Sequence, residues 1–434
     1  MFGIKKILQF RHSELAHNSA TLLSANVVAQ VIGIIIYPVL TRLYSPDDFG
    51  LLNLFLSIGG VLVILANSEI HFSVVLPKDE KRAVACFHNG LSTLVGVSLL
   101  CIAFIPFSKP IANLFNAPQL ANWIFLLPVF VFSQAIWTLI NYWYTRNKQY
   151  RDIGIYQLMQ SGLSAGAKCG LGFLGFLSGG MIVSMVFAPL ASVLISIKAT
   201  FAKHMKALLK VDKDECRIAA REYVNFPKYD MPRAVINNFS CNLPFFLLTP
   251  YFGLAEMGFL GMAFTLAIRP INVVANSFNQ VLFQKTAESV HNKINVSHLF
   301  NRFVSFTLMA VVPTFAILYF VLPSLTEWLL GDGWSVAGSY IRIMLPWVAM
   351  NSIASSINFI PDVFKRQRGL LVFETAYFIV RAISLLIGIY LNSFITAIAL
   401  YSLSNTVMLI VECVWFRTII GNYERENQCA TFNS

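Results

Sequence analysis

The twelve residues TRLYSPDDFGLL at positions 41–52 have a counterpart in TPYFGLAEMGFL at positions 249–260. The two stretches start 249 − 41 = 208 residues apart, and each places a short turn before an apolar segment. A second pair follows at nearly the same spacing, because Asn67-Ser68 corresponds to Asn276-Ser277 at 276 − 67 = 209. Two matches at nearly one offset indicate that the chain consists of two homologous halves. Internal duplication of this kind is typical of membrane transporters.

The composition places most of the chain in a membrane. The 434 residues are 56% hydrophobic and 12% charged, and the mean hydropathy is +0.65. Such a chain is too apolar to fold as water-soluble domains. Long uncharged runs recur along it, and about 20 apolar residues are enough for a helix to cross a bilayer core about 30 Å thick. The sequence therefore predicts an all-α, polytopic membrane protein.

The apolar runs and the turns between them predict twelve transmembrane helices, six in each half. The predicted spans are residues 20–41, 49–76, 83–107, 121–145, 153–177, 180–199, 234–252, 258–283, 303–323, 338–360, 370–391 and 394–416. The halves are predicted to form two six-helix lobes, 1–215 and 216–434, joined through a basic linker at residues 198–233. Because six is an even number of spans, we expect the lobes to be related by a pseudo-two-fold axis along the membrane normal.

The basic residues predict how the chain is oriented. The formal net charge of +11 would suit a nucleic-acid partner, but in a membrane protein Lys and Arg first report which loops are cytoplasmic. Of the 32 Lys and Arg, 26 fall at the N-terminus, in alternate connections or in the C-terminal tail, which leaves 32 − 26 = 6 elsewhere. Both termini are therefore predicted to be cytoplasmic, and no nucleic-acid partner is expected. The basic segment 1–17 is interpreted as the start of a retained first helix rather than a signal peptide.

The sequence gives no sign of catalysis or of a cofactor. The seven cysteines are scattered and include no CxxC pair, so neither a disulfide framework nor a metal site is predicted. A phosphate-binding loop of the G-x-x-x-x-G-K-[ST] type is absent from the sequence, which argues against ATP hydrolysis. We therefore expect no catalytic residue, no metal and no cofactor, and a protein that is not an enzyme.

Four cations fall within predicted spans, namely Lys168, Arg269, Arg342 and Arg381. A charge at membrane depth costs several kcal/mol, so such residues usually face a water-filled cavity or a partner. For Arg381 a structural alternative exists, because Glu374 lies seven residues earlier on the same helical face. As a set, the four cations favour a functional role.

Polar residues surround these cations at helical spacing. In the eighth span one stripe of a helix holds Thr265, Arg269, Asn272, Asn276 and Gln280. The fifth span repeats the pattern with Gln157, Ser161, Ser164 and Lys168. Uncharged stripes of this kind also mediate helix packing in lipid. Stripes that contain Lys168 or Arg269 are better explained by a polar, cationic lumen.

A carboxylate and an imidazole lie close together in the second span. Glu69 and His71 are two residues apart, and histidine titrates near physiological pH. A proton-sensing pair is one interpretation. The other is that both lie near the cytoplasmic end of the span, where charged residues are ordinary.

Several segments resemble one known family. LTRLYSPDDFG at 40–50, YTRNKQY at 144–150 and FPKYDMP at 226–232 carry the resemblance, together with residues 253–258 and Arg269-Pro270. The chain is similar in these segments to the oligosaccharide flippases, the Wzx-like polysaccharide transporters of the multidrug/oligosaccharidyl-lipid/polysaccharide exporter superfamily. The resemblance spans nearly the whole chain, although each motif alone is only moderately specific.

The resemblance implies a transporter of the bacterial cytoplasmic (inner) membrane. Members move an undecaprenyl-diphosphate-linked oligosaccharide, for O-antigen, capsule or a related glycan, to the outer leaflet by alternating access without ATP. Expected partners are the lipid-linked glycan, the lipid bilayer, and a polymerase and chain-length regulator of the same pathway. The expected substrate-binding residues are Arg269, Lys168, Arg381, Arg42, Asn272 and Asn276. Arg42 and Arg269 lie in the motifs quoted above, whereas depth and charge alone nominate Lys168 and Arg381.

Three alternatives differ in features that the sequence displays. A drug exporter of the same superfamily would favour acidic cavity residues, but the buried charge here is mainly basic. A lipid II flippase typically carries two further helices, for which this chain has no room. A membrane-embedded polysaccharide polymerase or ligase should show a large outer loop and no duplication. Here the outer loops are short and the two halves share similar sequence segments.

Overall fold

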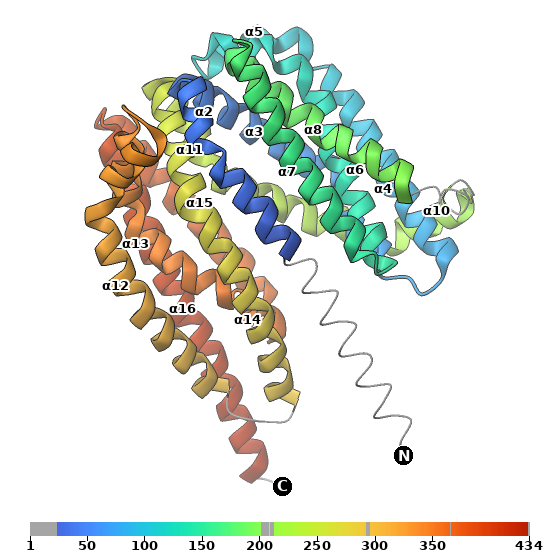
Figure 1. Ribbon diagram of the computed structural model, residues 1–434. Helices are drawn as coiled ribbons and strands as arrows, with labels where there is room; N and C mark the ends of the chain where they lie inside the picture. The colour runs from blue at the N-terminus through green and yellow to red at the C-terminus, as the bar shows by residue number, and fades with distance from the viewer. Residues whose placement is uncertain (1–23, 201–207, 209–211, 292–295, 365, 433–434) are drawn as a thin grey trace. The chain divides into compact units, whose positions relative to one another are not determined.

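The computed structural model describes residues 24–200, 208, 212–291, 296–364 and 366–432. These residues form helices joined by short turns (Figure 1), and no strand occurs in this part of the chain. The predicted all-α class is therefore confirmed. The basic N-terminal segment 1–17 and the first residues of the first predicted span lie outside the described residues.

The helices follow the predicted spans closely. After a helix at residues 24–35 come α2 (Tyr37–Leu43), α3 (Pro46–Asn67), η1 (Ile70–Val74), α4 (Glu80–Ile102), α5 (Ser108–Leu114), α6 (Leu127–Arg146), α7 (Tyr150–Phe173) and α8 (Leu177–Thr200). Then follow α10 (Lys213–Glu222), η6 (Phe226–Asp230), α11 (Met231–His291), α12 (Val296–Leu330), α13 (Ser335–Ile357), α14 (Ile360–Val363), α15 (Gln367–Tyr390) and α16 (Phe394–Phe432).

Within the described residues, ten helices are long and apolar enough to cross a membrane. One of these, at 226–272, covers parts of two predicted spans, the seventh and the eighth. The fifth predicted span is present as α7, whose glycines, serines and glutamines make it less apolar. With α7 and the second part of α11, 10 + 1 + 1 = 12 helices occupy the twelve predicted positions.

The chain divides by its internal contacts into unit 1, Met1–Ala255, and unit 2, Glu256–Ser434. Helix α11 contributes to both units. Its backbone leaves the helical conformation at Gly253, with φ 83° and ψ 177°, a region that only glycine occupies readily. The seventh predicted span ends at the residue before this break. The predicted division into 1–215 and 216–434 was based on the sequence duplication and not on contacts. It stays a prediction.

The first copy of the repeated motif starts a helix in unit 1. The Ser45 hydroxyl accepts a hydrogen bond from the Asp48 backbone N–H at 3.3 Å, and the Asp48 carboxylate accepts one from the Ser45 N–H at 2.9 Å. This reciprocal capping box, with Pro46 at the first helical position, satisfies two backbone donors that the start of α3 would leave unpaired. One turn later Gly50 meets the second copy of the motif, because a Cβ on Gly50 would lie 1.9 Å from the Leu254 carbonyl oxygen. The two copies therefore touch within unit 1.

Each unit has its own apolar core. In unit 1 the largest fully buried side chains come from α3, α6 and α7, among them Phe55, Trp143 and Tyr156. In unit 2 a cluster that includes Phe303, Ile353 and Phe416 joins α12, α13 and α16. Sequential helices with alternating directions thus pack through large side chains in both units, as expected for helical bundles.

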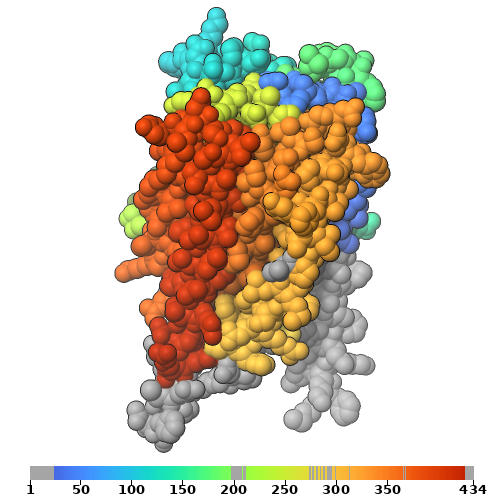
Figure 2. All heavy atoms as spheres, turned by 90° about the vertical axis from the view of Figure 1, so that its left-hand side faces the viewer, coloured from blue at the N-terminus to red at the C-terminus, as the bar shows by residue number. Residues whose placement is uncertain are grey.

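The outside of unit 2 is apolar. Figure 2 shows the face that carries α12 and α16, and on α12 the side chains of Met309, Phe320 and Trp328 are at least 75% exposed. Large exposed apolar side chains concentrated on one face usually mark a surface that a membrane or a partner covers. Bilayer hydrocarbon is such a partner, and this surface agrees with a multi-pass membrane protein.

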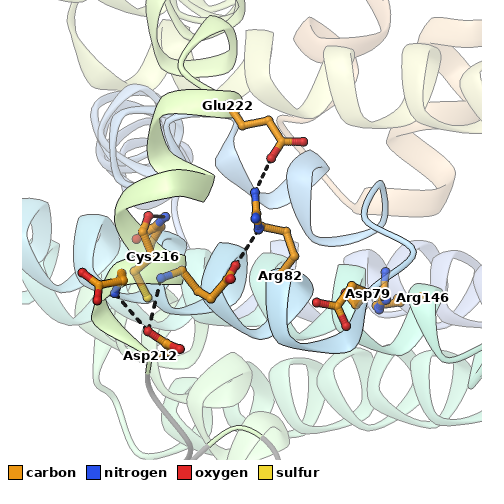
Figure 3. Close-up of polar contacts among 9 residues, drawn as sticks. Asp79, Arg82, Arg146, Asp212, Cys216 and Glu222 are labelled. Atoms are coloured by element: carbon orange, nitrogen blue, oxygen red, sulfur yellow. Dashed lines mark hydrogen bonds and ion pairs between the residues drawn. The ribbon is translucent and has the colours of Figure 1, made fainter.

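The linker between the predicted halves contains a docked helix. Helix α10 lies against the start of α4, and Figure 3 shows the Arg82 guanidinium directed toward Glu222 of α10. Arg82 Nε is 2.7 Å from Glu215 Oε2, and Arg82 Nη1 is 2.5 Å from Glu222 Oε2. Asn89 of α4 adds a hydrogen bond from its side-chain amide to the Cys216 carbonyl at 2.8 Å. The sequence analysis predicts this segment only as a basic linker, so its acidic docking face is a finding of the structure.

Removal of the Arg82 side chain should release α10 without unfolding unit 1. The ion pairs are partly exposed, and such pairs contribute little to stability because water screens them. We therefore expect Arg82→Ala to raise backbone deuterium exchange across 213–222 severalfold, with little change in thermal unfolding. Lys81→Ala removes an exposed neighbouring cation and should leave exchange unchanged. Equal exchange in wild type and Arg82→Ala would show that Asn89 and apolar contacts hold α10 by themselves.

The predicted topology can be tested at the two ends of α13. Asp332 is exposed in the turn before this helix, and Arg366 is exposed after the short helix that follows it. At 1.5 Å per residue, the 23 residues of α13 separate these turns by about 34 Å. In a chain without its native cysteines, Asp332→Cys should react with an impermeant thiol reagent added outside, and Arg366→Cys should not. If both cysteines are labelled from the same side, the tenth predicted span does not cross the membrane.

Candidate functional site

Two of the predicted substrate-binding residues lie in unit 1. Arg42 is exposed in the last turn of α2, where its guanidinium donates to the Pro38 carbonyl oxygen of the same helix. Lys168 is half-buried on α7, and its backbone carbonyl accepts a hydrogen bond from the Tyr44 hydroxyl at 2.6 Å. This hydrogen bond connects Tyr44, two residues after Arg42, to the turn of α7 that carries Lys168.

A polar contact between α3 and the first part of α11 also lies in unit 1. Ser57 of α3 donates to the Asn242 side-chain oxygen at 3.0 Å. The Asn242 amide in turn donates to the Asn238 carbonyl at 2.9 Å. Asn238 and Asn242 were not among the residues predicted from the sequence to bind substrate. Their i, i+4 spacing inside an apolar run was the available signal.

Arg269, Asn272 and Asn276 lie on the second part of α11, in unit 2. The Arg269 and Asn272 side chains are both exposed, and they are one turn apart. The Asn272 side-chain oxygen accepts a hydrogen bond from the Asn351 amide of α13 at 3.3 Å. Asn276 is part of the helix, but its side chain is outside the described ones. Arg269 therefore stands beside a polar contact between two membrane helices.

This contact continues along α11 and α13. Two turns beyond Asn272, the Asn279 amide donates to Asn358 Oδ1 at 2.7 Å and to the Ser355 carbonyl at 3.1 Å. We call Asn272, Asn279, Asn351 and Asn358 the asparagine row. Sequence reasoning missed three of its four members, because a partner 79 residues away is not visible in the spacing of one helix.

Arg381 is buried, with 8% of its surface exposed, and it has partners on its own and the neighbouring helix. Its Nε donates to Asn405 Oδ1 at 2.8 Å, and its guanidinium carbon lies 3.8 Å from the centre of the Tyr377 ring. The Tyr377 hydroxyl donates to the same Asn405 oxygen at 2.6 Å. Stacking and a charge-assisted hydrogen bond both stabilise a buried guanidinium. Arg381 therefore joins α15 to α16, and this geometry supports the structural alternative more than direct ligand contact.

The structure also brings Glu69 and His71 together at the end of α3. His71 Nε2 is 3.7 Å from Glu69 Oε2, and the His71 ring is 4.6 Å from the Tyr142 ring. Both Ser68 and Glu69 have positive φ, at 45° and 55°, which turns the chain sharply between α3 and η1. The proximity fits either interpretation of this pair, and proton sensing remains a hypothesis.

In the part of the chain that the structure describes, no group of three or more His, Cys, Asp and Glu side chains is placed to hold a metal ion. The candidate residues are instead cations, amides and hydroxyls. Guanidinium and ammonium groups with neighbouring amides suit an anionic ligand that also carries hydroxyl groups.

The arrangement of helices is that of a known class of transporters. An inward-facing multidrug resistance MATE family transporter of the MOP superfamily superposes with a TM-score of 0.71 and 14% identity, over 91% of this chain and 96% of that chain. The lipid II flippase MurJ, in an inward closed conformation, superposes with a TM-score of 0.68 and 14% identity, over 93% of this chain and 90% of that chain. At such identities the likeness shows the fold alone. It is the twelve-helix, two-lobe fold of MATE transporters.

The family follows from the sequence comparison. Residues 39–339, which are 339 − 39 + 1 = 301 of the 434 residues, match the family described as polysaccharide biosynthesis protein. The chain belongs to this family, and the resemblance to polysaccharide flippases is confirmed. The succinoglycan biosynthesis transport protein ExoT of Rhizobium meliloti (strain 1021) is 20% identical over 361 residues, 80% of this chain and 68% of the relative. The family and its structural relatives are transporters and flippases rather than enzymes.

Proposed function

We propose that this protein moves a lipid-linked oligosaccharide, with undecaprenyl diphosphate as the carrier, from the cytoplasmic to the outer leaflet of the bacterial inner membrane. The observation that carries the proposal is a polysaccharide-biosynthesis family match over 301 residues on a MOP transporter fold. Two relatives add support, since one is named a succinoglycan transport protein and another a lipid II flippase. The transported glycan is an O-antigen, capsule or related repeat unit.

The proposed ligand explains why Lys and Arg side chains lie on membrane helices. A diphosphate brings at least two negative charges, which gain from each nearby cation in a medium of low dielectric constant. Arg269 is exposed on α11 and can form paired hydrogen bonds with phosphate oxygens. Asn272 and Asn276, one and two turns further on, would bind the first sugars. Lys168, Arg42 and Arg381 are the other cations proposed to bind the substrate.

Transport by alternating access requires that this headgroup be released as well as bound. We therefore propose moderate affinity and a site that opens to each leaflet in turn, as in transporters built from repeated halves. Both termini are proposed to be cytoplasmic. A polymerase and a chain-length regulator of the same pathway are proposed partners.

A drug exporter of the same superfamily is the second candidate, because the MATE transporter has the same fold. Cationic drugs need acidic groups in their binding site, whereas Arg42, Lys168 and Arg269 are all basic. The charge of the candidate residues therefore favours an anionic ligand.

A deletion strain tests the proposal directly. In spheroplasts that lack the gene, the lipid-linked glycan should stay on the cytoplasmic leaflet, protected from an impermeant lectin or oxidant. Expression of the wild-type chain from a plasmid should restore its exposure. An unchanged leaflet distribution, together with lost efflux of cationic dyes, would instead identify a drug exporter.

A further inference from the structure

Unit 2 contains a basic cavity at the turn between α14 and α15, on the predicted cytoplasmic side. The cavity has a volume of about 530 Å³. Arg366 and Arg368 line it from the start of α15, and Trp415, Thr418 and Asn422 line it from α16. None of these residues belongs to the asparagine row or to the Arg381 contacts. The cavity is therefore separate from the residues proposed to bind the glycan carrier.

Two arginines give this cavity its positive charge. Both arginine side chains are exposed, and among the residues that the structure describes no acidic side chain lines the cavity. Across the described residues, neither guanidinium has a carboxylate partner within ion-pair distance. Two cations at one cavity, with hydroxyl and amide groups opposite them, suit a phosphate.

The opposite wall is shaped by Trp415. Trp415, Thr418 and Asn422 lie at i, i+3 and i+7, so one face of α16 presents an aromatic ring followed by two polar groups. The ring lies against Gly369, where a Cβ would be 2.7 Å from Trp415 Cζ2, and it stacks on Phe373 at an angle of 15°. A tryptophan fixed in this way is typical of the boundary between hydrocarbon and headgroups.

The surface beside the cavity is apolar. Val372 on α15 is 70% exposed and Val414 on α16 is 57% exposed, and both lie within predicted membrane-crossing stretches. A ligand with its phosphate in the cavity would therefore lie at the membrane surface, with space for acyl chains along these helices. A free phosphate ion would use the arginines but not this apolar surface.

A turn of unit 1, between α6 and α7, also has a basic cavity, but its charge is already engaged. A cavity of about 690 Å³ there is lined by Arg146, Lys148 and Glu80. The Arg146 guanidinium, however, donates to backbone carbonyls of the loop before α4, including that of Pro77. Its hydrogen bonds hold the loop, and a carboxylate offsets part of the charge.

We propose that the cavity of Arg366 and Arg368 binds the headgroup phosphate of an anionic phospholipid. The two guanidinium groups bind the phosphate oxygens, and the Asn422 amide donates to a remaining headgroup oxygen. The acyl chains lie along Val372 and Val414. The bound lipid joins the start of α15 to the end of α16, so it stabilises this edge of unit 2.

Native mass spectrometry of the full-length protein in detergent, titrated with phosphatidylglycerol or phosphatidylethanolamine, tests this proposal. Wild type should retain phosphatidylglycerol in preference to phosphatidylethanolamine. Arg366→Ala/Arg368→Ala should weaken phosphatidylglycerol binding by about tenfold or more, since both basic residues that attract the anionic headgroup are lost. Arg417→Ala removes a nearby exposed cation that does not line the cavity, and it should bind as wild type does.

Two further measurements separate loss of lipid binding from loss of folding, and a lipid ligand from a free phosphate ion. Arg366→Lys/Arg368→Lys preserves the charge and loses the forked donors, so its affinity should fall between the other two even where the alanine pair folds poorly. Inorganic phosphate at millimolar concentration should not displace the lipid. Displacement by phosphate would show a site for the free ion and overturn the assignment to a lipid. Equal binding of both lipids, or full binding by the alanine pair, would also overturn it.

Discussion

Replacement of Arg269 by alanine should abolish glycan translocation while the amount of membrane-inserted protein stays at the wild-type level. The side chain is exposed on α11, so its removal leaves no cavity and no unpaired buried group in unit 2. Loss of hydrogen bonds to a charged phosphate costs about 1.5–3 kcal/mol, which is about ten- to a hundredfold in binding. Arg269→Lys should restore part of the rate, because lysine keeps the charge but loses the fork.

The measurement is the rate at which lipid-linked glycan becomes accessible in spheroplasts of the deletion strain that express each variant. Arg417→Ala, which removes an exposed cation from α16, is a matched control and should transport normally. Arg381→Ala should differ from Arg269→Ala in lowering thermal stability as well, since Tyr377 and Asn405 would lose their buried partner. Wild-type transport by Arg269→Ala would mean that the carrier phosphate binds elsewhere, with Arg42 and Arg342 as the next residues to test.

A single added methyl group at Gly50 should strongly destabilise unit 1. A Cβ at this position would lie 1.9 Å from the Leu254 carbonyl oxygen and 2.7 Å from the carbonyl carbon. Both atoms are backbone, so a side-chain rotation cannot relieve the overlap. Overpacking commonly costs about 1–3 kcal/mol, and we expect Gly50→Ala to reach or exceed the upper end.

Membrane-inserted yield and the midpoint of thermal unfolding measure this effect. Gly96→Ala provides the matched control, because this glycine lies in α4 with no atom within 4 Å of an added Cβ. Alanine is favoured over glycine inside a helix by about 0.5–1 kcal/mol, so the control should be neutral or slightly stabilised. If Gly50→Ala melts at the same temperature as Gly96→Ala, the contact with Leu254 is not tight in the folded protein.

The helices could be predicted from the sequence because a membrane helix is a local feature. A run of about 20 apolar residues must satisfy its own backbone groups in lipid, whatever its neighbours are. The start of α3 is local as well, since Ser45, Pro46 and Asp48 supply the cap within four residues, but the predicted span began three residues later, at Phe49. Apolar runs and turns therefore gave all twelve positions.

The candidate site was less predictable, because its partners come from distant parts of the chain. Ser57 meets Asn242 across 185 residues, and Asn279 meets Asn358 across 79. Helical spacing predicts which residues share a face but not which helix covers that face. Arg381 shows the same limit, since its depth and charge suggested a ligand while Asn405, 24 residues away, provides a partner.

The end of unit 1 at Ala255 predicts where the chain can be divided into two fragments that each keep their own contacts. A fragment that ends at residue 215, where the predicted duplication divides, would lack both Asn242, the partner of Ser57, and Leu254, the neighbour of Gly50. A fragment that ends at residue 255 would contain both contacts. The two cut sites lie 255 − 215 = 40 residues apart, and the seventh predicted span, 234–252, lies between them. Co-expressed fragments split at 255 should therefore reassemble, whereas a split at 215 leaves the first fragment with an uncovered helix face.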